Sequence, residues 1–90
     1  MKNFRTFIAA VEFYKQAQKL NPKSHVKDQL NRASLSIALN LAEGRARSSV
    51  KDRLRFYNIS FSSLREVQAL LIIMGMENSD EWKLLDSVAA

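Results

Sequence analysis

The sequence predicts an all-α protein, an up-down antiparallel helical bundle with three long helices and a short or truncated fourth. Apolar residues recur every three or four positions along most of the chain, which is the spacing of one helix face. Only two Gly and one Pro occur, and they fall where the apolar periodicity stops. Since 90 residues suit one small domain, residues 1–90 are expected to form a single helical-bundle domain.

Composition excludes several classes of protein. The chain has no Cys, which rules out disulfide frameworks, thiolate catalysis and iron–sulfur clusters. The longest apolar run, Ala69–Met74, is far shorter than the roughly 20 residues of a membrane span. The first residues lack the continuous apolar core and cleavage site of a secretory signal. A cytoplasmic location is therefore expected.

The first helix is predicted over Asn3–Leu20, where Phe4, Phe7, Ile8, Val11, Tyr14 and Ala17 share one face. It should end at Asn21-Pro22, because the residue before Pro avoids the α region and Pro cannot continue the helix. A second helix is expected to begin with Ser24 as its N-cap. It should stop at Gly44, in the left-handed conformation of a helix C-cap.

A third helix is predicted to begin at Ser49, with Asp52 completing a capping box, and to run to about Met74. Its apolar residues form two rows, Leu54, Tyr57, Phe61, Leu64 and Leu71 in the first, and Phe56, Ile59, Val67, Leu70 and Met74 in the second. Two rows exceed what one small core hides, so the second row and the outer face of the first helix are expected to form a subunit interface.

The last segment is predicted to be a short fourth helix. Gly75 should end the third helix, and Asn78 or Ser79 can cap the next one. Trp82, Leu85 and Val88 or Ala89 then supply a single apolar stripe. A helix of about ten residues is marginal in water alone, so it must pack on the others.

Charge is distributed unevenly along the chain. Residues 1–65 carry a net charge of +9 and residues 66–90 carry −4. Helical spacing places Lys51, Arg55, Asn58, Ser62 and Arg65 along one stripe without an acidic residue, and Arg45 and Arg47 extend it. The nucleic-acid-binding candidates are accordingly Arg45, Arg47, Lys51, Arg55 and Arg65. An ordinary solvated face, or pairing with acids of a neighbouring subunit, remains the alternative.

The remaining polar residues suggest structure more than chemistry. Arg32, Asn40, Glu43 and Asp52 are candidates for a hydrogen-bonded junction that holds the second helix against the third. His25 is the only histidine, and no nucleophile, metal-ligand set or glycine-rich phosphate loop accompanies it. The sequence therefore predicts no enzyme, no cofactor and no metal site, and no small-molecule substrate or membrane partner is expected.

A dense motif covers the second and third predicted helices. It comprises Gln29, Arg32, Ala33, Ser36, Ile37, Asn40, Ala42, Glu43 and Gly44, then Arg47-Ser48, Asp52, Arg55-Phe56, Asn58-Ile59, Ser63-Leu64 and Glu66. The run resembles the four-helix-bundle family named for open reading frames in intervening sequences of bacterial 23S ribosomal RNA. That family also contains the accessory variability determinants of diversity-generating retroelements.

The resemblance implies a homopentamer with a basic surface, and no enzymatic activity. It further implies association with RNA and, in the retroelement branch, with a reverse transcriptase. Ser60 and Ser62 depart from the family pattern, in which Ala and Gly are expected. A protein-interaction scaffold that does not bind nucleic acid is the alternative function.

Overall fold

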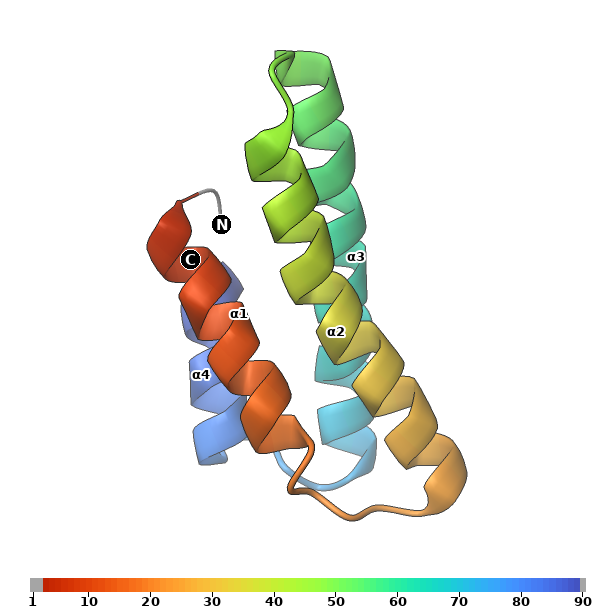
Figure 1. The fold of residues 1–90 in the computed structure, drawn as a ribbon. Coiled ribbons are helices and arrows are strands. Elements are labelled where there is room, and N and C mark those ends of the chain that lie inside the picture. The colour runs from red at the N-terminus through yellow and green to blue at the C-terminus, as the bar shows by residue number, and fades with distance from the viewer. Residues whose placement is uncertain (1–2, 90) are drawn as a thin grey trace.

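A computed structural model describes residues 3–89 and has the predicted all-α fold (Figure 1). Its helices contain 14, 23, 24 and 10 residues. In chain order they are α1 (Phe4–Ala17), α2 (Ser24–Ala46), α3 (Val50–Ile73) and α4 (Asp80–Ala89). The fourth helix is short, as the sequence indicates.

Consecutive helices run antiparallel, and the α2–α3 hairpin is the longest part of the molecule (Figure 1). α1 packs against α2 and α4, while α4 also touches α3. α1 and α4 cover one end of the hairpin, and the end that carries the α2–α3 turn projects beyond them (Figure 1). The molecule is elongated, with extents of 40 × 22 × 18 Å.

The core is built from all four helices. Its largest fully buried apolar side chains are Phe13, Leu30, Ile37, Leu41, Leu64, Val67, Leu71, Leu85 and Val88. Both predicted rows of α3 contribute to it, because Leu64 and Leu71 belong to the first row and Val67 and Leu70 to the second. The prediction that the second row faces a subunit interface is therefore wrong for Val67 and Leu70, which are covered within the monomer.

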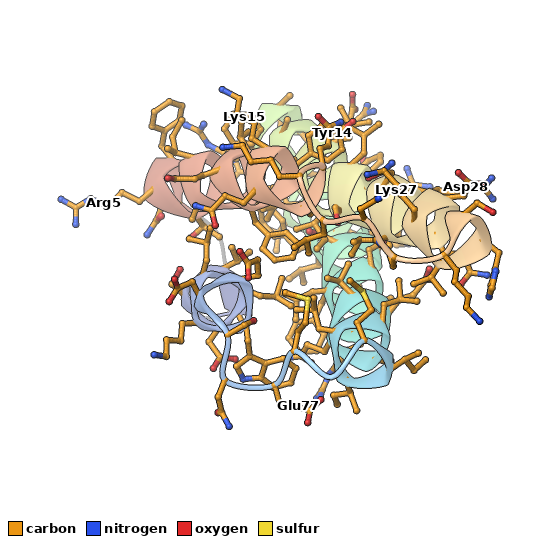
Figure 2. All side chains as sticks on the ribbon, turned by 90° about the horizontal axis from the view of Figure 1, so that it is seen from below. Arg5, Tyr14, Lys15, Lys27, Asp28 and Glu77 are labelled. Carbon is orange, nitrogen blue, oxygen red and sulfur yellow. The ribbon has the colours of Figure 1, made fainter. Side chains whose placement is uncertain are left out.

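Two helix ends differ from the sequence predictions near the α1–α2 loop. α1 ends at Ala17, earlier than the predicted Leu20. The Lys27 ammonium group donates hydrogen bonds to the carbonyl oxygens of Gln18 and Leu20 at 3.1 and 2.6 Å, so carbonyls freed at the helix end have a partner. Lys27 lies beside this loop in Figure 2. α2 begins at Ser24 itself, and its N-cap is Lys23, which makes no side-chain capping bond.

The predictions for Ser49, Gly75 and the cap of α4 are confirmed in their local geometry, although only the Ser49 half of the predicted capping box is present among the described hydrogen bonds. The Ser49 hydroxyl accepts a hydrogen bond from the Asp52 amide at 3.1 Å and caps α3. Gly75 follows the end of α3 with a φ of 72°, a left-handed conformation that suits glycine. Of the two candidate caps for α4, Ser79 is the one that accepts the Trp82 amide, at 3.1 Å.

Gly44 does not end α2, contrary to the prediction, because the helix continues to Ala46. Gly44 is buried, and a Cβ atom built there would lie 2.6 Å from Cε1 of Tyr57. The glycine is thus required by the close approach of α3, and its backbone is ordinary helix. A packing constraint between helices explains a residue that the sequence suggested was a helix terminator.

We predict that Gly44→Val lowers the free energy of unfolding by about 1–3 kcal/mol, because the added methyl groups overpack the contact with Tyr57. Thermal or urea unfolding measures the change. Adding Tyr57→Ala to Gly44→Val should recover part of the loss through the coupling of adjacent sites. Ala42→Val, at an exposed position of the same helix, is the matched control and should cost under about 1 kcal/mol. Equal losses at positions 42 and 44 would contradict the packing explanation.

Candidate nucleic-acid interface

The predicted cationic residues lie along the α2–α3 hairpin, from the projecting turn to beyond the middle of α3. The side chains of the predicted stripe and of the preceding turn are all exposed, comprising Arg45, Arg47, Lys51, Arg55, Asn58, Ser62 and Arg65. They come from the last turn of α2, the loop after it and the outer face of α3. The monomer therefore leaves this entire cationic surface accessible to a polyanion.

Three arginines of this surface lie over phenylalanine rings of α3. The guanidinium carbon atoms of Arg47 and Arg55 both lie 4.8 Å from the ring centroid of Phe56. Arg65 lies 5.1 Å from the centroid of Phe61 on the same helix. Such cation–π contacts contribute about 0.5–1 kcal/mol each when exposed, and they restrict the orientation of the guanidinium group.

The predicted cations do not all share one direction. Arg45 lies over the ring of Phe4 at 4.9 Å and so turns toward α1. Arg47 and Arg55 are brought together on Phe56, while Arg65 is two to three turns further along α3. The structure thus assigns Arg45 to the edge near α1 and the other cations to the α3 side of the hairpin.

Two arginines make hydrogen bonds at the turn after α2. The Arg47 guanidinium donates to Oε2 of Glu43 at 2.9 Å, an ion pair whose side chains are 44% and 53% exposed. At that exposure the pair adds little stability. Nε of Arg53 donates to the backbone carbonyl of Arg47 at 2.7 Å, which ties the loop to the first turn of α3. The loop is therefore held in place mainly by backbone capping and Arg53.

The residues of the predicted polar junction make mostly local contacts. Asn40 donates to the carbonyl and hydroxyl of Ser36, one turn earlier in α2. Glu43 pairs with Arg47, the Asp52 amide donates to Ser49, and Arg32 is exposed. Each of these contacts lies within four residues along the chain.

Serines provide side-chain hydrogen bonds from α2 to α3. The hydroxyls of Ser36 and Ser63 are 2.8 Å apart, and buried Ser60 donates to the carbonyl of Ile37 at 2.8 Å. Ser36 and Ser63 belong to the family motif, and Ser60 is one of the departures from it. Neither hydrogen bond was predicted from the sequence, because each joins residues more than 20 positions apart.

The aromatic part of the surface was not predicted from the sequence. Phe56 and Phe61 lie beneath Arg47, Arg55 and Arg65. One signal was available for Phe61, which precedes Arg65 by four residues and so shares its helix face. The contact of Arg47 with Phe56 crosses the turn and has no comparable signal in the sequence.

The described residues give no support for a metal site or a membrane span. Within residues 3–89, no group of three or more His, Cys, Asp and Glu side chains is placed to hold a metal ion. His25 is exposed at the start of α2. Among the described helices, none combines the length and apolar character needed to cross a membrane.

The fold and the surface together define a small all-α bundle protein that presents a cationic helical hairpin. Comparison with known families identifies it more closely. The family model of the 23S rRNA-intervening sequence protein matches residues 2–81, which is most of the chain. This protein belongs to that family, as the motif in α2 and α3 suggested. No match was found among curated proteins or among solved structures.

Proposed function

We propose that this protein is a non-enzymatic, self-assembling helical protein that binds RNA through the cationic surface of its α2–α3 hairpin. One observation carries the proposal: every residue of the stripe from Lys51 to Arg65 is exposed, and the stripe contains no acidic residue. Phosphate contacts dominate the affinity of proteins for nucleic acids, and exposed Lys and Arg supply them. The family is one of small helical proteins that are not known as enzymes, which supports the non-enzymatic part.

Exposed apolar side chains support self-assembly. Large hydrophobic residues remain at least 38% exposed at ten positions, Phe4, Ile8, Leu35, Leu39, Val50, Leu54, Ile59, Phe61, Ile72 and Ile73. Phe4 and Ile8 lie one turn apart on α1, and Leu35 and Leu39 lie one turn apart on α2. Neighbouring exposed apolar side chains of this kind are typical of surfaces that contact another protein. A homopentamer, as the family resemblance implies, would bury these two pairs on α1 and α2.

A second candidate function follows from Leu54 and Phe61. These two side chains are 43% and 38% exposed on the same helix as the cations. An apolar stripe next to positive charge also suits an acidic protein partner, including a nucleic-acid-processing enzyme such as a reverse transcriptase. Pull-down with and without nuclease separates the two functions, because a partner held by protein contacts survives digestion of the RNA.

We predict that replacing Lys51, Arg55 and Arg65 together with Gln weakens RNA binding regardless of sequence. The slope of log affinity against log salt should become shallower by about 2–3, since three phosphate contacts are lost. Gel-shift titration with structured RNA at several salt concentrations measures both quantities.

The matched control is the triple replacement of Lys15, Lys19 and Lys23 with Gln, which removes the same charge from exposed positions outside the hairpin end. Lys15 points outward from α1 in Figure 2. Equal weakening by the two triple variants would mean that net charge matters and the position of the stripe does not. A folded protein that leaves RNA mobility unchanged at low salt would remove the proposal.

We predict that Ile8→Ser combined with Leu39→Ser lowers the oligomer mass, because both changes remove exposed apolar side chains from the proposed interface. Light scattering coupled to size exclusion gives the mass. Ile73→Ser is the control, since Ile73 is 71% exposed at the far end of α3. A wild-type protein that is monomeric at all tested concentrations would refute the assembly.

A further inference from the structure

The environment of Phe56 is the most specific feature of the cationic surface. Two guanidinium groups, from Arg47 and Arg55, contact this one ring at the same distance of 4.8 Å. Their carbon atoms are therefore at most about 10 Å apart. Phe56 is itself half-buried on α3, and both arginines lie against its ring.

We infer that Arg47, Phe56 and Arg55 form a preorganised two-arginine clamp for neighbouring phosphates of an RNA backbone. The inference rests on the proposed function and specifies where on the hairpin the phosphates are held. A guanidinium group that stacks on an aromatic face keeps its N–H edges free, and those edges match phosphate oxygens in a bidentate geometry. The ring contributes by positioning the two arginines and does not itself bind phosphate.

Preorganisation gives the clamp its advantage over the other cations. A free arginine side chain loses conformational entropy when it is fixed on a ligand. Contact with Phe56 already restricts the side chain before RNA binds, so less conformational entropy remains to be lost. The loop that carries Arg47 is also held, because its backbone carbonyl accepts the hydrogen bond from Arg53. Lys51, whose ammonium group has no planar face to stack, lacks this advantage.

Glu43 regulates the clamp by competing for one of its arginines. Its carboxylate accepts a hydrogen bond from the Arg47 guanidinium at 2.9 Å. A phosphate that binds Arg47 through the same N–H edge must displace this carboxylate. Since the pair is about half exposed, displacement costs little, and the carboxylate weakens phosphate binding without blocking it.

The first experiment measures binding of fluorescent single-stranded oligouridine by anisotropy, using the full chain. Arg47→Lys and Arg55→Lys keep the charge but remove the planar fork, and each should weaken binding about three- to tenfold. Phe56→Leu retains an apolar side chain while removing the platform, and should weaken binding about two- to fivefold. Circular dichroism and the melting temperature verify that each variant is folded.

Phe61 and Arg5 provide the matched controls. Phe61 lies beneath a single arginine of the same helix, and Arg5 is an exposed arginine of α1 outside the stripe. Phe61→Leu and Arg5→Lys should each change affinity less than about twofold. If Arg47→Lys with Arg55→Lys binds like wild type while the Lys51, Arg55 and Arg65 triple Gln variant binds weakly, the clamp is refuted and the proposed function stands. If the triple variant also binds like wild type, both fail.

We predict that Glu43→Gln strengthens oligouridine binding about two- to fivefold by releasing Arg47 from its carboxylate partner. Asp52→Asn is the matched control, since it removes one negative charge from an exposed residue of the same hairpin end. The control should have the smaller effect. Equal strengthening by both variants would show that overall charge acts alone and would overturn the role of Glu43.

Discussion

The close approach of α2 and α3 is the constraint on which the rest of the molecule depends. Tyr57 of α3 lies over Gly44, at a distance that leaves no room for a Cβ atom. Further along the same contact, buried Ser60 donates to a carbonyl of α2, and Ser36 bonds Ser63. Small side chains allow the helices to approach, and hydroxyl groups fix their register. The hairpin thereby becomes a stiff unit that extends beyond α1 and α4.

The two ends of the hairpin have different roles. At one end, leucine and valine side chains of α3 complete a core with the other three helices. At the other end, only α2 and α3 remain, and their outer positions are free to carry arginine and lysine. The acidic residues that follow α3 begin with Glu77, which lies at the end opposite the α2–α3 turn (Figures 1 and 2). Such a charge separation orients an approaching polyanion toward the cationic end.

Several features set by neighbouring residues could be predicted from the sequence, although Ser24 is not the N-cap it was predicted to be. Features set by contacts between helices could not be predicted. Caps such as Ser49 and Ser79 depend on one hydroxyl and an amide three residues later, so the pattern alone identifies them. In the sequence, Gly44 cannot be told apart from a glycine that ends a helix. Only its contact with the Tyr57 ring shows that it makes room for a side chain of α3. The burial of the two apolar rows of α3 likewise changes along the helix. Both are buried beside α1 and α4, and both are more exposed at the projecting end.

The proposed assembly and the proposed clamp depend on each other energetically. Two exposed arginines provide only a few phosphate contacts per copy, and such contacts are weakened strongly by salt. Identical copies joined through the exposed apolar residues of α1 and α2 would display several clamps at fixed separations. Binding of one clamp then raises the local concentration of RNA at the next, so the overall affinity rises without any new contact. On this view, the exposed apolar surface is what makes a modest cationic site sufficient, and loss of assembly weakens RNA binding even when every clamp is intact.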